Sequence, residues 1–228
     1  MAGLTRDEFL ERVRKAGARK IPSHAHDTAP VEGEPGRIEA VASLSDTFAE
    51  QAQAAGMHVH RASDLSEARE AVARIIREEK ATAVVTWPIP IIDQLALGRV
   101  LSAEGIAVER WDSTLPEAER KANAFAMSCG VTGVDYAVAE TGSLVVCSSP
   151  EHARSVSLLG KVHIAIVRED QVVPDLYDLF PRIQAEYPDG MPSNVTLITG
   201  PSKTADIELQ IVIGVHGPGT VHVVLVKS

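Results

Sequence analysis

The sequence predicts an α/β domain whose sheet is mainly parallel. Short β-branched runs alternate with helical segments, as expected for repeated βαβ units. Hydrophobic residues make up 45% of the chain but aromatic residues only 4%, so the core consists mainly of Ala, Val, Ile and Leu. The run Ala81–Trp87 is almost continuously apolar, which is typical of a strand buried on both faces. At 228 residues, the chain suits one large domain, or one domain with an N-terminal extension.

The N-terminal part is predicted to be separate from this domain. Residues 5–17 have helical spacing of apolar residues, and Thr5 stands three positions before Glu8, as in a capping box. Residues 18–36 are rich in Pro, Gly and polar side chains and predict a loop lying over the surface or over a partner subunit. We therefore divide the chain into an arm at 1–36 and an α/β domain at 37–228.

The first part of the predicted domain alternates regularly between helix and strand. Helices are expected at about 37–55, 64–79, 89–105 and 115–130, and strands at 57–62, 81–87 and 106–111. Ser63 or Asp64 is a suitable N-cap for the second of these helices. Pro116 in the first turn and Gly130 after the end delimit the fourth helix.

The pattern changes after Gly130. Residues 134–149 predict a strand, a polar turn and a second strand, and Val162–Glu169 predicts a further strand. A last helix is expected at 175–187, and the C-terminal part holds two strong strands around two Gly-Pro loops.

Composition and charge exclude several classes of function. The chain has 22 Lys and Arg against 31 Asp and Glu, a net charge of −9, and no long basic cluster, so a nucleic acid is not the expected partner. Only two cysteines occur, Cys129 and Cys147, and they form no CxxC pair, so we expect no iron–sulfur cluster on this chain. No signal-peptide pattern and no run of about 18 apolar residues occur, which predicts a cytoplasmic protein without a membrane span.

The first candidate site is the loop in Leu197–Glu208. Gly200 ends a predicted strand, and Ser202, Lys203 and Thr204 then supply two hydroxyls, a cation and backbone N–H groups. Such a loop after a strand suits a phosphate or a carboxylate, although the Walker A pattern is absent. A capped turn with a solvated lysine explains the same residues equally well.

The second candidate is the glycine-rich segment Ile213–Val226. Gly214, Gly217 and Gly219 allow tight turns, and His216 among them has the chemistry of a base, a hydrogen-bond donor or an anion contact. A histidine that only binds loop backbone is the equal alternative. His222, on the final strand, is predicted to be structural.

The third candidate is the turn between the two strands of 134–149. Glu140 would lie at a strand end, where open α/β sheets place ligands. Thr141 and Ser143 can donate hydrogen bonds to its carboxylate, and Gly142 leaves room for a substrate or for another backbone. A plain turn that carries a solvated glutamate is the alternative.

Metal-ligand types also occur, but their pattern carries little information. His24, His26 and Asp27 lie in the predicted arm, and His58 and His60 share one face of a strand that suits an edge position. We predict no metal site from them.

Taken together, "GVDYAVAETGSLVV", "TGPSKTADIE" and "GVHGP" resemble the lactate-utilisation protein C family, whose domain is called the LUD domain. The resemblance covers roughly Ala81 to the C-terminus, and more loosely the helical part from Arg37. It implies a three-layer α/β sandwich with a mainly parallel sheet, similar to the ribose-5-phosphate isomerase, glucosamine-6-phosphate deaminase and CoA-transferase group. The family's bacterial members are tied to growth on L-lactate and act with two iron–sulfur partner proteins that together oxidise lactate to pyruvate.

The fold kinship gives Glu140 a further interpretation. Class I CoA-transferases use a glutamate followed, one residue later, by glycine as the nucleophile, and Glu140-Thr141-Gly142 has that local form. The glycine-rich loop that those enzymes carry elsewhere is missing, so this activity is not transferred.

The resulting prediction is a non-cluster component of an L-lactate oxidation system that binds a small anion and iron–sulfur partner subunits. Homo-oligomerisation and catalysis by this chain alone stay open. The alternatives are a free-standing enzyme acting on a phosphorylated or CoA-linked molecule through Glu140, and a non-catalytic binding or regulatory module. The predicted site comprises Glu140, Thr141, Gly142, Ser143, Gly200, Ser202, Lys203, Thr204 and His216.

Overall fold

The computed structural model describes residues 6–17, 43–205 and 211–227. The chain divides into two compact units, an N-terminal one and a larger one that contains the α/β domain. The described part of the first unit is the helix α1 (Arg6–Gly17), whose Glu11 and Lys15 form an ion pair of 3.0 Å one turn apart. The division into an arm and a domain stays a prediction.

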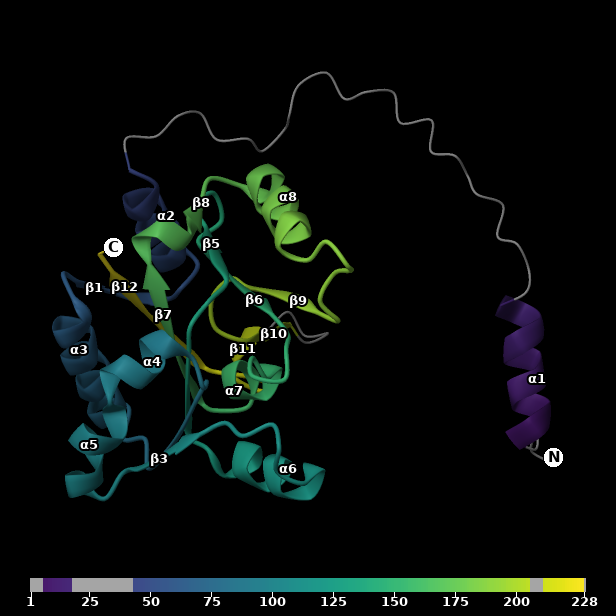
Figure 1. Cartoon of the computed structure of the whole chain (residues 1–228), viewed down its shortest axis with the longest axis horizontal. Helices are drawn as coiled ribbons and strands as arrows, with labels where there is room; N and C mark the ends of the chain where they lie inside the picture. The colour runs from purple at the N-terminus through teal and green to yellow at the C-terminus, as the bar shows by residue number, and fades with distance from the viewer. Residues whose placement is uncertain (1–5, 18–42, 206–210, 228) are drawn as a thin grey trace. The chain divides into compact units, whose positions relative to one another are not determined.

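A six-stranded sheet forms the centre of the domain (Figure 1). Its strand order is β1-β12-β7-β4-β2-β3, and every pairing in it is parallel. The strands are β1 (His58–Ala62), β12 (Thr220–Val226), β7 (Val162–Arg168), β4 (Cys129–Thr132), β2 (Ala83–Thr86) and β3 (Ala107–Arg110). The predicted fold class, α/β with a mainly parallel sheet, is therefore confirmed.

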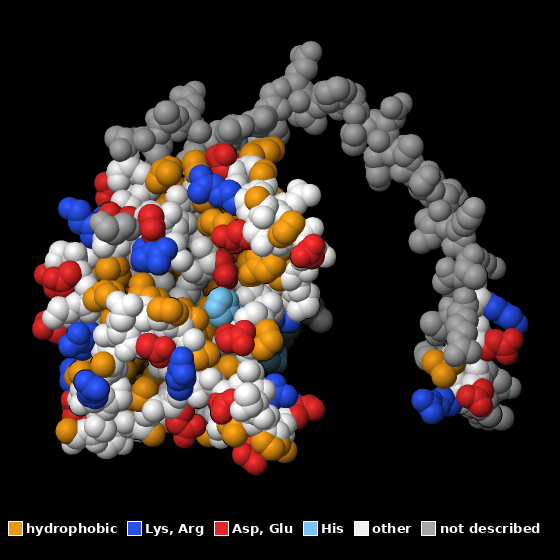
Figure 2. All heavy atoms as spheres, viewed as in Figure 1, with side chains coloured by type: hydrophobic (Ala, Val, Ile, Leu, Met, Phe, Trp, Pro, Cys, Tyr) orange, Lys and Arg blue, Asp and Glu red, His pale blue; other side chains and the backbone are white. Residues whose placement is uncertain are grey.

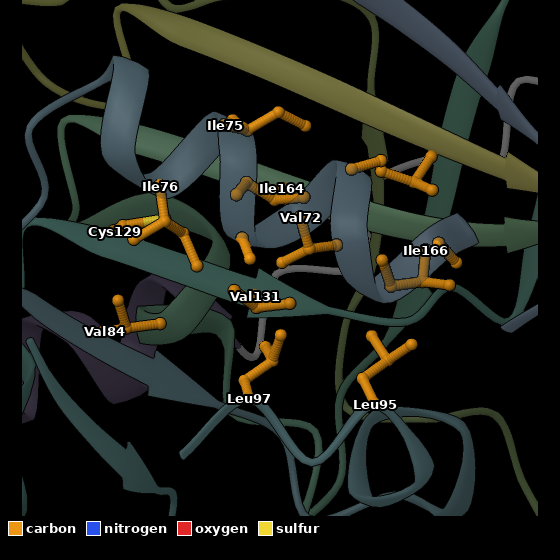
Figure 3. Packing of buried hydrophobic residues seen from close by; sticks show 14 of the residues in the cluster. Val72, Ile75, Ile76, Val84, Leu95, Leu97, Cys129, Val131, Ile164 and Ile166 are labelled. Carbon is orange, nitrogen blue, oxygen red and sulfur yellow. The ribbon is translucent and has the colours of Figure 1, made fainter. Parts of the chain in front are cut away.

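One face of this sheet is covered by helices from the first half of the domain (Figure 1). They are α3 (Leu65–Glu78), α4 (Pro90–Leu95) and α5 (Leu97–Leu101), followed by the short 3-10 helix η1 (Ser102–Glu104). Asp64 caps α3, as expected, because its side chain accepts hydrogen bonds from the N–H groups of Ser66 and Glu67. Figure 3 shows Val72, Ile75 and Ile76 of α3 packed over strand residues such as Val131 and Ile164. This contact removes the apolar stripe of α3 and one face of the sheet from water together.

The other face of the sheet packs against α2 (Leu44–Ala54) and a second, four-stranded sheet. The second sheet has the order β8-β5-β6-β9 and contains β5 (Tyr136–Val138), β6 (Ser143–Cys147), β8 (Val172–Val173) and β9 (Val195–Ile198). β5 and β6 form the antiparallel pair that was predicted around the polar turn, and β9 pairs antiparallel with β6. The helix α8 (Leu176–Glu186) covers the outer face of the second sheet through Leu179 and Ile183.

The remaining described elements connect these layers. They are α6 (Glu117–Ala126), α7 (Arg154–Leu158), the 3-10 helix η2 (Glu169–Gln171) and the antiparallel ribbon of β10 (Lys203–Ala205) and β11 (Ile211–Ile213).

Two predicted elements were wrong in detail. The helix expected at 115–130 ends at Ala126, and Cys129–Thr132 forms β4 in the middle of the sheet. Gly130 therefore does not terminate a helix: a Cβ there would lie 1.8 Å from the carbonyl oxygen of Val156, so the glycine permits α7 to approach β4. The helix expected at 89–105 is interrupted at Ala96, which has a φ of +47°.

The surface and the helix lengths agree with the composition. On the face shown in Figure 2, Lys and Arg side chains are interspersed with Asp and Glu, without a field of one sign. None of the helices in the described part of the chain is long and apolar enough to cross a membrane.

Candidate functional site

The turn that carries Glu140 packs against the helix α2. Gly142 has a φ of +64°, and a Cβ at this position would lie 2.2 Å from the backbone nitrogen of Ala52. The glycine thus leaves room for another backbone, one of the two roles considered from the sequence. Glu140 is half-buried, and its backbone N–H donates to the carbonyl of Pro174 at 2.9 Å.

The loop after β9 packs on the same end of α2. Gly200 has a φ of +96°, and a Cβ there would lie 2.3 Å from the carbonyl oxygen of Ala55. The exposed Lys203 donates from Nζ to that same oxygen at 3.4 Å. Because both loops meet the C-terminal end of α2, this helix holds two of the three predicted segments in fixed positions.

Three hydroxyl groups link these two loops directly. Ser143 Oγ lies 2.7 Å from Thr141 Oγ1 and 2.6 Å from Thr199 Oγ1. Ser143 is only 2% exposed, so its hydrogen bonds to these two hydroxyls take the place of the hydrogen bonds to water that its side chain loses on folding. Thr141 and Ser143 therefore bond to each other and to the neighbouring loop.

We expect Ser143→Ala to lower the free energy of unfolding by about 1–3 kcal/mol, because it leaves the hydroxyls of Thr141 and Thr199 without this partner. Denaturant unfolding followed by circular dichroism measures the change. Ser149→Ala is the matched control, since Ser149 is exposed. An equal, small effect of both substitutions would show that the hydroxyl chain does not hold the loops.

The glycine-rich segment predicted at Ile213–Val226 joins the loop after β9 through backbone contacts. Ser202 donates its N–H to the carbonyl of Pro218 at 2.9 Å, and its own carbonyl accepts from the N–H of Gly214 at 2.9 Å. A Cβ on Gly217 would lie 3.1 Å from Ser202 Cβ. Lys203 and Thr204 pair with Ile213 and Val212 in the ribbon of β10 and β11. The three segments therefore form one continuous group of loops.

A pocket of about 220 Å³ opens among these loops, between the central sheet and β9. We call it the loop pocket. Three of the predicted residues line it: Gly200, Ser202 and His216. The rest of the lining comprises Ser157, Leu158, His163, Thr196, Leu197, Ile198, Thr199, Gly217, Pro218 and Val221. The predicted residues Glu140, Thr141, Gly142, Ser143, Lys203 and Thr204 are not among its lining residues. Ser143 is joined to the pocket wall through Thr199.

The loop pocket contains a histidine that was not predicted. His163, on β7, is fully buried, and its Nε2 lies 2.8 Å from Thr132 Oγ1. Its Nδ1 has no hydrogen-bond partner among the described residues. Burial lowers the pKa of His163 to about 4, so the ring is neutral at physiological pH. In the sequence, His163 stands within the apolar run of a predicted strand, and this run does not indicate a pocket.

A second cluster lies at the carboxyl ends of β2 and β4. The next strand of the sheet after β2 is β3, on one side of this pair, and the next strand of the sheet after β4 is β7, on the other side. Open α/β sheets bind ligands at such a point, where the strand order reverses. There, the rings of Trp87 and His152 stack with centroids 4.5 Å apart, and His152 Nδ1 lies 3.7 Å from Asp135 Oδ1. Burial raises the pKa of Asp135, while the N–H of Cys147 and the nearby His152 oppose this shift. Sequence reasoning named only Trp87 at this position.

His60 of the edge strand β1 and His222 of β12 belong to a separate hydrogen-bonded chain. His60 Nε2 lies 3.0 Å from His222 Nδ1, and His222 Nε2 lies 3.1 Å from Glu79 Oε1. No group of three or more His, Cys, Asp or Glu side chains in the described ranges is arranged to hold a metal ion. His24, His26 and Asp27 lie outside the described residues.

Comparison with known proteins gives a consistent family assignment. A family model described as the LUD domain matches residues 45–226. A lactate utilization protein C from Halalkalibacterium halodurans is 38% identical over 152 residues, which are 65% of this chain and 64% of that protein. The chain thus spans a little under two thirds of the length of that relative.

Two further matches extend over more of the chain. The uncharacterized protein YkgG of Escherichia coli is 32% identical over 227 residues, covering 93% of this chain and 94% of that protein. The crystal structure of a DUF162 family protein from Deinococcus radiodurans superposes with a TM-score of 0.58 at 22% identity, covering 80% of this chain and 96% of that one. The latter similarity concerns the fold alone.

Proposed function

The chain belongs to the LUD-domain family, and from this membership we propose that it takes part in lactate utilisation. The relatives named lactate utilization protein C support this role, and the one from Halalkalibacterium halodurans matches at 38% identity. We propose further that the chain contributes a binding site for a small anion rather than a redox centre.

The loop pocket is the proposed site of that anion. Its volume of about 220 Å³ is below the roughly 300–1,000 Å³ of clefts that enclose drug-sized ligands, so a molecule of a few carbon atoms fits it better than a CoA ester or a phosphosugar. The hydroxyl of Ser202 and the ring of His216 supply polar contacts in its wall. The observation that carries the proposal is the match between a small pocket with a few polar groups in its wall and a family named for lactate.

The two cysteines support placing the electron carriers on partner proteins. Burial raises the pKa of both Cys129 and Cys147 to about 12, and iron–sulfur clusters require thiolates. The two side chains also belong to different hydrophobic clusters, one on the α3 face of the central sheet and one beneath α8. We therefore propose that iron–sulfur subunits act together with this chain.

A charge placed at the loop pocket tests the binding proposal. Leu197 lines the pocket and is 38% exposed, so Leu197→Glu adds a carboxylate without emptying the core. We expect calorimetry to show at least about a tenfold loss of affinity for L-lactate or pyruvate, because like charges repel. Phe180→Glu is the control, since Phe180 is an exposed apolar residue on α8. Absence of carboxylate binding to the wild type, or unchanged binding to L197E, would contradict the proposal.

Growth tests the cellular role. A strain that lacks the gene should lose growth on L-lactate, and the wild-type gene should restore it better than L197E does. Purification from lactate-grown cells should recover iron-containing proteins. Normal growth of the deletion strain would exclude the lactate role, and purification without iron would exclude the partner proposal.

Glu140 is proposed as the residue to test for catalysis. Its turn is joined to the pocket wall through Ser143 and Thr199. Glu140→Gln preserves the shape of the side chain and removes its charge, so turnover measured with the partner proteins should fall if the carboxylate is needed. Unchanged turnover would show that the Glu140 carboxylate is not needed for catalysis and that the residue has only a structural role in the turn.

A further inference from the structure

The loop pocket reaches from an exposed histidine to a buried one. His216 is exposed, whereas His163 is 0% exposed, so the pocket has an outer and an inner end. The two ends therefore offer different environments to a ligand, one close to water and one enclosed by protein.

At the inner end, one nitrogen of His163 is engaged and the other is free. The contact between Nε2 and Thr132 Oγ1 fixes the orientation of the ring. Nδ1 is buried and lacks a partner among the described residues, although buried polar atoms in folded proteins are nearly always paired. Leaving such an atom unpaired costs about 1–3 kcal/mol, which a ligand atom bound at this position would offset.

The charge state of His163 restricts what that ligand atom can be. Burial keeps the ring neutral, because its pKa is lowered to about 4. A carboxylate enclosed at this depth would lose its hydration without gaining a cation in return, at a high cost. An uncharged oxygen avoids this cost. A hydroxyl is especially suitable, because it can donate or accept and therefore matches either tautomer of the ring.

At the outer end, a carboxylate meets suitable groups. The ring of His216 and the hydroxyl of Ser202 both line the pocket, and water remains near the exposed histidine. A carboxylate can therefore keep part of its hydration there. A small molecule that spans the pocket thus needs an ionised end and, within a few bonds, an uncharged oxygen.

We propose that His163 binds the C2 oxygen of a small 2-hydroxy or 2-oxo acid, and that it selects such acids over carboxylates that lack this oxygen. The inference rests on the proposed function, since it assumes that the loop pocket holds a small carboxylate. It adds the residue that recognises the second polar group. Thr132 is the positioning residue, because it acts only through the ring of His163.

A comparison of L-lactate with propionate tests this role. The two share a carboxylate and three carbon atoms, but propionate lacks the C2 oxygen. We expect calorimetry on the full chain to show at least about tenfold tighter binding of L-lactate than of propionate, as expected for a buried nitrogen left unpaired by propionate.

Two matched substitutions separate the nitrogens of His163. The amide of asparagine reaches the position of Nδ1, whereas that of glutamine reaches the position of Nε2. His163→Asn should therefore keep most of the preference for L-lactate. His163→Gln should reduce the ratio of the two affinities to about 1 while propionate binding stays unchanged.

Nitrogen NMR of the wild type gives an independent readout if the variants do not fold. L-Lactate should shift the Nδ1 signal of His163, and propionate should not. Equal affinities of the wild type for the two acids, an unshifted Nδ1 signal with L-lactate, or a full preference in H163Q would overturn the inference but leave the anion pocket standing. Failure of both acids to bind the wild type would overturn the inference together with the proposed pocket.

Discussion

Replacing Gly142 by alanine is expected to lower the free energy of unfolding by about 2–5 kcal/mol. The residue has a φ of +64°, which disfavours any side chain with a Cβ, and the new Cβ would lie 2.2 Å from the nitrogen of Ala52 and 2.6 Å from its Cα. Both neighbouring atoms belong to the backbone of α2, so a rotamer change cannot relieve the overlap. The turn and the helix must move apart, and the contact that positions Glu140 is lost.

Denaturant unfolding of G142A and of a control, Gly98→Ala, measures this effect. Gly98 is an exposed residue of α5, and a Cβ there would meet no atom within 4 Å. In the control, alanine should leave stability unchanged or raise it by up to about 1 kcal/mol, because it restricts the unfolded chain. If G142A is as stable as the control, the turn does not pack against α2 as described.

Acidification is expected to destabilise the protein through His163. The unfolded chain binds a proton at this ring near pH 6.5, whereas the folded protein resists it down to about pH 4. Between these values the unfolded state carries more protons, so the free energy of unfolding falls as the pH falls. The contribution of His163 is fully present above pH 6.5, and about 3 kcal/mol of it is lost by pH 4.

Unfolding free energies measured from pH 7 to pH 4 isolate this contribution. His163→Asn has no titrating group in this range, so its loss of stability over the interval should be smaller than that of the wild type by about 3 kcal/mol. Phe180→Ala serves as the control, because it changes an exposed side chain that does not titrate, and its pH profile should follow that of the wild type. Identical pH profiles for H163N and the wild type would show that His163 is not buried in a neutral form.

Local sequence patterns predicted most of the secondary structure. The alternation of β-branched runs with helical spacing identified β1, β2, β3 and β7 and the helices between the first three, since each pattern depends on residues a few positions apart. The same logic failed at β4. That strand is four residues long and follows an alanine-rich helix, so its neighbours favoured continuing the helix. Only its pairing with β2 and β7 makes this segment a strand.

The candidate site was predictable as three separate loops but not as an arrangement. Residue types indicated Gly200, Ser202 and His216, which the structure places around one pocket, and also Glu140 and Lys203, which lie outside its lining. His163 was not predicted to line the pocket. A histidine among the apolar residues of a strand does not indicate a pocket until the elements that face it are known.

By itself, the sequence determined the fold class and the polar turn after β5. The tertiary structure alone decided that Ser143 meets Thr199, that Gly142 faces α2, and that one nitrogen of His163 has no partner. The physical reason is the range of the interactions. Backbone periodicity and turn propensity act over a few residues, whereas the loop pocket is enclosed by segments from Ser157 to Val221 that only the packing of two sheets brings together.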